Sequence, residues 1–129
     1  MSDSLNQANS NTSTTIFVVD DEPLLLDLAA AILKPLGYRV FTFRDPRLAL
    51  KETSAAKPAV IVTDFAMGEM TGLDLTRECK IQNPAQKIIL LSGTVDESIY
   101  SAAAYKPDLF LAKPYQVREL ISAIQTLTK

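Results

Sequence analysis

The chain alternates short apolar runs with stretches of helical periodicity, and no other feature restricts its fold as much. Most of the apolar runs lack the polar alternation of a half-exposed strand, which is typical of parallel strands covered on both faces. Strands separated by helices favour right-handed crossovers, and therefore a parallel sheet with helices on both sides. The predicted strands are residues 15–19, 39–43, 59–63, 87–91 and 109–112.

Caps, prolines and glycines mark the ends of the predicted helices. Asp21 or Glu22 can cap the first helix and Pro23 fits its first turn. Pro35 ends or bends this helix early, and Gly37 closes it. Its helical spacing is set by Leu25, Leu28, Ala29, Ile32 and Leu36. Four further helices are predicted, one starting at residues 45–46 and the others over residues 73–81, 96–104 and 117–127.

Composition bounds the class of protein. The 129 residues, 47% of them hydrophobic, suit one domain whose core needs no disulfide or structural metal. A net charge of −2 gives no sign of nucleic-acid or membrane-surface binding. The absence of histidine excludes a histidine-based catalytic triad. Cys79 is the only cysteine, so it cannot form an internal bridge, and we expect it to pack as a small apolar residue.

The first fourteen residues are polar and contain neither the basic nor the apolar segment of a secretory signal. No apolar run is long enough to span a bilayer. We therefore expect a disordered tail over residues 1–14, one domain over residues 15–129 and a cytoplasmic protein. The tail fits a free terminus, which Met1 favours, and it also fits a linker in a longer protein.

Polar side chains follow the predicted strands at their carboxyl ends. Asp20 and Asp21 come after the first strand, Asp64 after the third, Ser92 after the fourth and Lys113 after the fifth. The carboxyl ends of parallel strands meet at one edge of the sheet, where α/β proteins bind their ligands. We therefore expect these five side chains to meet in one crevice.

The chemistry of this set indicates phosphoryl transfer with Mg²⁺. Three carboxylates at close range resist ionisation unless a cation is present, and Mg²⁺ prefers oxygen ligands from a few carboxylates and water. Lys113 and Ser92 add a positive charge and a hydroxyl donor, which stabilise a transferring phosphoryl group. Asp64, alone at the tip of the central strand, is the best nucleophile and would form an acyl phosphate. Asp20 and Asp21 are then the metal binders.

Five motifs, in order and each at a strand end, resemble the receiver domain of two-component response regulators, including the chemotaxis regulators. The resemblance extends from Ile16 to the end of the chain. It implies a flavodoxin-like, doubly wound α/β fold of three layers, with five helices and a five-stranded parallel sheet in the order 2-1-3-4-5. The motifs are Val18-Val19-Asp20-Asp21-Glu22, Val62-Thr63-Asp64-Phe65-Ala66-Met67, Met70-Thr71-Gly72, Leu91-Ser92-Gly93 and Ala112-Lys113-Pro114-Tyr115.

The resemblance also implies roles for the metal-binding and phosphoacceptor residues. Asp64 would be the phosphoacceptor. Asp20 and Asp21 would be the acidic pair, with Asp21 and Asp64 binding Mg²⁺ directly and Ala66 adding its backbone carbonyl.

Three further roles follow from the same resemblance. Ser92 would be the switch hydroxyl that bonds one phosphoryl oxygen, and Lys113 the cation that pairs with another. Phe110 would be the switch aromatic, which swings inward when the hydroxyl moves toward phosphate. The Lys113–Pro114 bond would be cis.

A histidine kinase or phosphotransfer protein is the phosphodonor that the resemblance implies, and a small phosphodonor could replace it. The domain would catalyse only the transfer to Asp64 and the hydrolysis from it, and would otherwise not be an enzyme. Its switch would control a downstream protein or output domain that the sequence does not name. The last two helices could pair two copies after phosphorylation, although no residue pattern decides it.

The chain departs from the family pattern at three places. Gly68 stands where the family often has proline, so we expect a more flexible loop. The resemblance implies that the positions of Ala66 and Thr94 tune the lifetime of the phosphoryl group, and Ala66 cannot hydrogen-bond an attacking water. Residues 105–108 replace the usual small-residue turn, which affects the length and position of the helix before the last strand.

Three alternative functions fit the sequence less well. A Mg²⁺-dependent phosphatase with an aspartyl nucleophile needs a second acid two residues later, where this chain has Ala66. A flavodoxin-like nucleotide binder needs a Ser/Thr/Gly-rich loop after the first strand, whereas Asp20, Asp21 and Glu22 would repel phosphate. A degenerate receiver that acts only as an interaction module would need a defect among the acids or the lysine, and none is seen.

Overall fold

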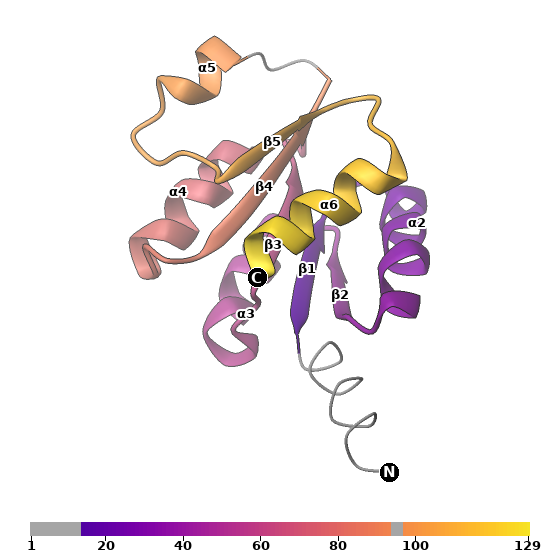
Figure 1. Cartoon of the computed structure of the whole chain (residues 1–129). Helices are drawn as coiled ribbons and strands as arrows, with labels where there is room; N and C mark the ends of the chain where they lie inside the picture. The colour runs from indigo at the N-terminus through magenta and orange to yellow at the C-terminus, as the bar shows by residue number, and fades with distance from the viewer. Residues whose placement is uncertain (1–13, 94–96) are drawn as a thin grey trace.

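A sheet of five parallel strands forms the centre of the computed structural model, which describes residues 14–93 and 97–129. The strand order is β2-β1-β3-β4-β5, as the resemblance implied (Figure 1). Each of the five predicted strands is present, although β3 includes Asp64 and β4 includes Ser92. The strands are β1 (Thr15–Val19), β2 (Arg39–Phe43), β3 (Val60–Asp64), β4 (Lys87–Ser92) and β5 (Leu109–Ala112).

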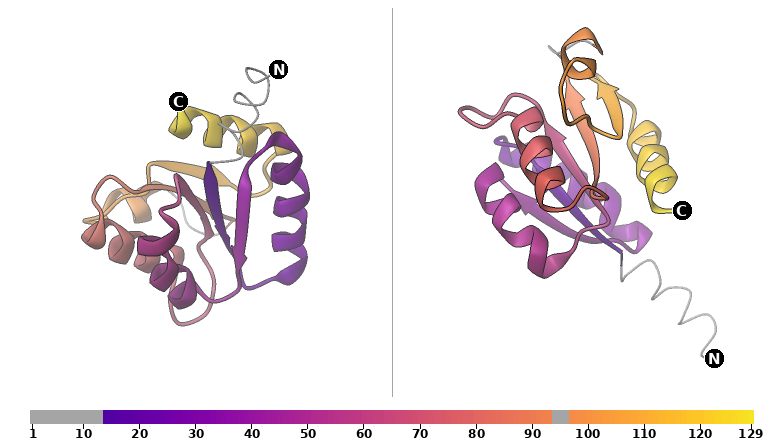
Figure 2. Two further views of the ribbon diagram at one scale, coloured as in Figure 1. Left: turned by 90° about the horizontal axis from the view of Figure 1, so that it is seen from below. Right: turned by 90° about the vertical axis from the view of Figure 1, so that its left-hand side faces the viewer.

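Helices cover both faces of this sheet (Figure 2). On one face lie α2 (Pro23–Leu33) and α6 (Val117–Thr128), and on the other lie α3 (Pro46–Ala56) and α4 (Gly72–Gln82). A short helix, α5 (Glu97–Ser101), precedes β5. The predicted three-layer α/β fold is therefore confirmed. Within the described ranges, no helix is long and apolar enough to cross a membrane.

Alternation along the strands divides the core between the two faces. In β1, Ile16 and Val18 pack toward α2 and α6, whereas Phe17 and Val19 pack toward α3 and α4. All four side chains are buried, as expected for a parallel strand with helices on both sides. The predicted tail over residues 1–14 lies outside the described residues except for Thr14, whose carbonyl accepts a hydrogen bond from the Arg39 N–H.

The first helix begins and ends close to the predicted positions. Glu22 occupies the N-cap position, but its side chain makes no capping hydrogen bond. Pro35 ends the α-helix at Leu33, as predicted, and a 3-10 turn, η1 (Lys34–Leu36), follows. Gly37 closes this turn with φ 96°, a left-handed conformation that a residue with a Cβ adopts only at a cost.

The helix predicted over residues 96–104 is wrong at its C-terminal end. It stops at Ser101, and the next residues form a turn in which the Ala103 N–H donates to the Tyr100 carbonyl. Pro107 disfavours helical backbone in the residue before it, and the Asp108 N–H must reach the Ile88 carbonyl to start β5. The chain therefore turns over residues 102–105, where part of the helix was predicted, before it becomes extended and enters β5. The predicted start at residue 96 lies outside the described residues.

Candidate functional site

The predicted site residues meet at the carboxyl edge of the sheet. Hydrogen bonds between neighbouring strands continue past the strand ends, from the Asp20 N–H to the Phe43 carbonyl and from the Lys113 N–H to the Ser92 carbonyl. The central strand β3 brings Asp64 to the same edge, between β1 and β4. The sheet therefore holds the backbone of Asp20, Asp64, Ser92 and Lys113 at one edge, although a single crevice that contains all five predicted side chains stays a prediction.

Three carboxylates form an acidic cluster here. Asp20, Asp21 and Asp64 each offer an oxygen, and these oxygens lie within 4.8 Å of one another. Asp20 and Asp64 are buried, whereas Asp21 is exposed to solvent. The oxygen ligands of one Mg²⁺ lie about 3–4 Å apart, because each is about 2.1 Å from the ion. The cluster therefore fits a small hard cation with one side open to water.

Burial raises the pKa of Asp20 above its ordinary value. The Glu22 N–H, which donates to Asp20 Oδ1 at 3.0 Å, opposes this shift, as does Lys113. The negative charges of Asp64 and Asp21 add to it. Asp20 is thus a carboxylate that gains from a nearby cation, as expected of a metal-binding acid.

Lys113 is the cation that faces the cluster. Its amine lies 2.8 Å from Asp64 Oδ1. Burial lowers the pKa of Lys113, but the hydrogen bond and charge of Asp64, with a contribution from Asp20, outweigh burial and raise it. The peptide bond between Lys113 and Pro114 is cis, so that part of the prediction is confirmed.

The N-terminus of α4 packs directly on the backbone of Asp64. A Cβ on Gly72 would overlap the Asp64 carbonyl oxygen and would lie 2.6 Å from Leu90 Cδ1. The Gly72 N–H also donates to the Phe65 carbonyl at 2.9 Å. Thr71 and Asp74 complete the helix start with a capping box. Only glycine allows this approach, which closes the loop that contains Ala66.

That loop leaves the Ala66 side chain exposed and passes through Gly68, which has φ 90°. A positive φ is strained for any residue with a Cβ, and proline could not adopt it. The departure from the family pattern at Gly68 therefore accompanies a different loop conformation. Glu69, next along the loop, pairs with Arg47 on α3 at 3.0 Å.

Ser92 and Phe110 lie on the same face of the sheet. Ser92 pairs with Ala112 and Leu90 pairs with Phe110, so alternation directs both side chains toward the α4 side. Ser92 is buried, whereas Phe110 is partly exposed. The ring of Phe110 stacks on Tyr100 of α5, with centroids 4.8 Å apart and planes at 16°. Sequence reasoning missed Tyr100, since a ring contact between a helix and a strand has no local signature.

An apolar groove opens beside the acidic cluster. It has a volume of about 460 Å³, and Asp20 and Lys113 lie at its edge. The face of α2 that packs on the sheet is formed by Leu26, Ala29 and Leu33. Leu28 lies off this face and is 56% exposed. The groove is lined on one side by Leu25, Leu28, Ala29 and Ile32, and on the other by Pro114, Tyr115, Val117 and Leu120.

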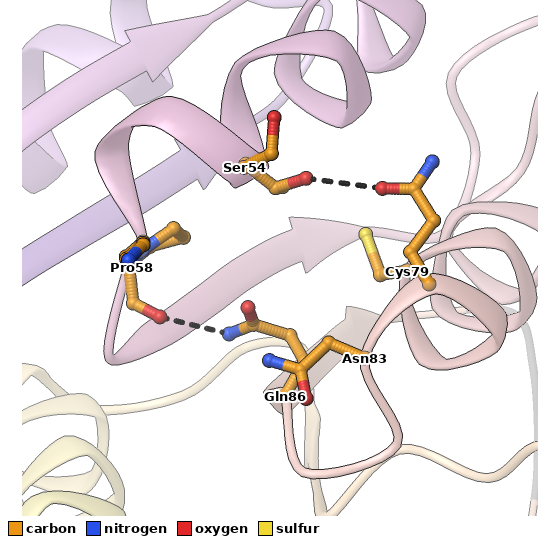
Figure 3. A pocket seen from close by; sticks show the side chains of 8 residues that line it. Ser54, Pro58, Cys79, Asn83 and Gln86 are labelled. Carbon is orange, nitrogen blue, oxygen red and sulfur yellow. Dashed lines mark hydrogen bonds between the residues drawn. The ribbon is translucent and has the colours of Figure 1, made fainter.

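A second, polar pocket of about 380 Å³ lies between the C-terminal ends of α3 and α4, away from the acidic cluster (Figure 3). Its polar groups bond to each other; for example, Gln86 Nε2 donates to the Pro58 carbonyl at 3.1 Å. Burial, with the charge of Glu78, raises the pKa of the Cys79 thiol at its base to about 11. Cys79 is therefore a packed, unreactive thiol, as the sequence indicated.

Residues 16–125 match the family model described as the response regulator receiver domain. The chain belongs to this family. Such receiver domains are the phosphoacceptor domains of two-component signalling, with phosphorylation on an aspartate.

Solved receiver domains have the same fold. A receiver domain protein from Clostridium thermocellum has a TM-score of 0.82 and 27% identity, over 89% of this chain and 94% of that one. The response regulator TrrA from Thermotoga maritima, solved in complex with Mg²⁺ and BeF, has a TM-score of 0.78 and 27% identity, over 88% and 98% of the two chains.

Among curated proteins, the chain is 28% identical over 117 residues to the probable transcriptional regulatory protein TcrX of Mycobacterium tuberculosis. The match covers 89% of this chain but 50% of TcrX. The chain thus spans about half the length of this relative.

Proposed function

We propose that Asp64 is the phosphoacceptor of this receiver domain. The observation that supports this best is the position of Asp64: one carboxylate oxygen lies 2.8 Å from the amine of Lys113, and two further acids complete the cluster. An oxygen of Asp64 attacks the phosphorus of the donor, the bond from phosphorus to the leaving group breaks, and the electron pair departs with that group. The product is an acyl phosphate on Asp64.

The other site residues act on the charge that develops during this transfer. Lys113 pairs with one phosphoryl oxygen and Ser92 donates a hydrogen bond to another. Asp20, Asp21, Asp64 and the carbonyl of Ala66 would hold Mg²⁺. When bound there, the ion offsets the repulsion between the carboxylates and neutralises charge on the phosphoryl group. Ala66 offers no hydrogen bond to a water that would hydrolyse the product.

We propose a histidine kinase or phosphotransfer protein as the donor, with small phosphodonors as substitutes. The apolar groove between α2 and the start of α6 supports a protein donor, because it adjoins Asp20 and Lys113 and exposes Leu28. When Asp64 is phosphorylated, the Phe110 ring moves toward Ser92. This movement changes the surface that a downstream protein or output domain binds. Pairing of two copies after phosphorylation would be one such output.

Phosphorylation with acetyl phosphate and Mg²⁺ tests the assignment of Asp64. Intact-mass spectrometry should show one added phosphoryl group that is stable in acid and lost in base. Asp64→Asn should abolish it, whereas Asp27→Asn, an exposed acid on α2, should label like the parent. Equal labelling of Asp64→Asn and the parent would refute the proposal.

A further inference from the structure

The helix α5 has too few residues to be stable by itself. It covers only Glu97–Ser101, and isolated helices need about 12–15 residues to persist in water. Contacts with the rest of the domain must therefore hold it. Among the α5 side chains that the structure describes, Ser98 and Ser101 are exposed and Tyr100 is partly buried.

Tyr100 makes the ring contact that joins α5 to β5. Its ring is nearly parallel to that of Phe110, at a centroid distance of 4.8 Å. Stacked pairs of this kind are favourable beyond the area they bury, by an amount equal to roughly a three- to tenfold shift in a two-state population. The contact is specific to these two residues, because Tyr105, on the segment that follows α5, has no ring partner among the described residues.

Phe110 cannot keep this contact and also turn toward the phosphoacceptor. Its side chain lies on the same sheet face as that of Ser92. Ser92 is two register positions nearer the carboxyl edge, because Phe110 pairs with Leu90 and Ser92 pairs with Ala112. Side chains occupy discrete staggered rotamers, so a turn of the ring along the sheet toward Ser92 takes it out of the stack in one step. The Tyr100 ring would then lose its partner, and α5 the ring contact that holds it to β5.

We propose that Tyr100 is a brake on the receiver's switch: its stack stabilises the resting position of Phe110, and the inward turn of Phe110 releases α5. The proposal rests on Asp64 as phosphoacceptor and on Phe110 as the aromatic that moves. It assigns Tyr100 as a positioning residue that never touches the phosphoryl group. It also implies that the packing of α5 on β5 changes when Asp64 is phosphorylated.

The test measures the affinity for beryllofluoride, a phosphoryl mimic, in the presence of Mg²⁺, by ¹⁹F NMR of the bound fluorides. A ligand that binds the switched state gains apparent affinity as that state becomes more populated. Tyr100→Leu keeps an apolar side chain and removes the ring, so its affinity should rise by roughly three- to tenfold. Tyr100→Phe keeps the stack and should match the parent, as should Tyr105→Leu.

A double-mutant cycle separates the brake from general damage to the fold. In a Phe110→Leu background the stack is already lost, so Tyr100→Leu should cause no further change in affinity. Two results would overturn the proposal. One is that Tyr100→Leu raises the beryllofluoride affinity equally in the parent and in Phe110→Leu; the other is that it does not raise the affinity in the parent. If Tyr100→Leu does not fold, Tyr100→Met takes its place in the cycle.

The outcome also distinguishes this proposal from the assignment of Asp64. Suppose that the parent binds beryllofluoride, that Asp64→Asn does not, and that Tyr100→Leu binds with the affinity of the parent. The assignment of Asp64 as phosphoacceptor is then supported, and the proposed role of Tyr100 is wrong. If Asp64→Asn binds as well as the parent, the phosphoacceptor itself is wrong and the brake falls with it.

Discussion

The amine of Lys113 lies 2.8 Å from Asp64 Oδ1, so the cation at the end of β5 is paired with the carboxylate at the end of β3. The pKa of Lys113 is raised by this pairing, and the lysine stays charged at neutral pH. Lys113 therefore places one positive charge against a cluster of three acids. It attracts phosphoryl oxygens, and it repels a divalent cation bound to the same carboxylates.

Replacement of Lys113 should separate these two effects. In Lys113→Met, Mg²⁺ binding should tighten, by roughly tenfold or less, because a neighbouring positive charge is gone. The rate of labelling by acetyl phosphate should fall by about 100-fold, since the transferring group loses its counter-charge. Isothermal titration calorimetry measures the Mg²⁺ affinity, and timed labelling measures the rate of phosphorylation. Lys106→Met, at an exposed lysine, is the control, and weaker Mg²⁺ binding in Lys113→Met would contradict the expectation.

Replacement of Asp20 should stabilise the metal-free protein at neutral pH. The pKa of Asp20 is raised in the folded state, so its protonated form favours folding, and the parent loses that stability as pH rises through the raised value. An amide in place of this carboxyl group would not titrate. The free energy of unfolding of Asp20→Asn should therefore exceed that of the parent by an amount that is smallest below pH of about 3.9 and grows toward neutral pH.

Urea unfolding over a pH series with a chelator present measures this difference, with Asp27→Asn as an exposed control. Added Mg²⁺ should reverse the order, because it stabilises the state that binds it and Asp20→Asn has lost one of the acids that hold it. A parent that is more stable than Asp20→Asn at pH 7 without Mg²⁺ would show that the Glu22 N–H and Lys113 outweigh burial.

The strands and the site edge could be predicted because their signals are local. Apolar runs such as residues 60–63 reveal strands buried on both faces, and the polar residue after each run follows the strand to the same edge. The grouping of Asp20, Asp64 and Lys113 thus needed only topology, and the structure places them together. Residue types and their order were sufficient for that step.

The rest depends on contacts between distant segments. The end of α5 at Ser101 is decided by where β5 must join β4, and the Tyr100–Phe110 stack by the resulting position of the helix. Likewise, the close approach of α4 to Asp64 is invisible until the helix is packed, although Gly72 directly after Thr71 marks the helix start. Helical periodicity predicts a helix for residues 25–36 without deciding which of its leucines face the sheet.

A methyl group on Gly72 should disturb both stability and the phosphoacceptor. The Cβ of Gly72→Ala would overlap the Asp64 carbonyl, and backbone cannot yield as a flexible side chain can, so a loss of about 1–3 kcal/mol in the free energy of unfolding is expected. Labelling of Asp64 should also slow, because the carboxylate is attached to the displaced backbone. Chemical denaturation and acetyl phosphate labelling measure both effects.

Gly93→Ala is the matched control, since its Cβ would meet Lys113 Cβ at an ordinary 3.6 Å. It should therefore cost much less stability than Gly72→Ala. Similar losses in the two variants would mean that flexibility of glycine, and not the contact with Asp64, decides the effect at position 72.

The ion pair between Lys80 and Asp108 should stabilise the junction of α4, β4 and β5 far more than an exposed pair would. Lys80 Nζ lies 2.9 Å from Asp108 Oδ2 and donates to the Gln86 carbonyl at 2.7 Å, and the same Asp108 oxygen accepts from the Ile88 N–H at 2.8 Å. The two side chains are only 12% and 22% exposed. Lys80→Met should lower the free energy of unfolding by about 1–3 kcal/mol, because it leaves a largely buried carboxylate and carbonyl without their shared donor.

Arg77→Met is the control for this ion pair, since it breaks the exposed pair between Arg77 and Glu78 and should cost about 0.5 kcal/mol or less. Chemical denaturation of both variants and the parent, in low and high salt, measures the contrast. The loss in Lys80→Met should persist in high salt, because a largely buried pair is screened much less than an exposed one. Equal losses in the two variants, or a loss in Lys80→Met that disappears in high salt, would show that the Lys80 pair is no stronger than a surface one.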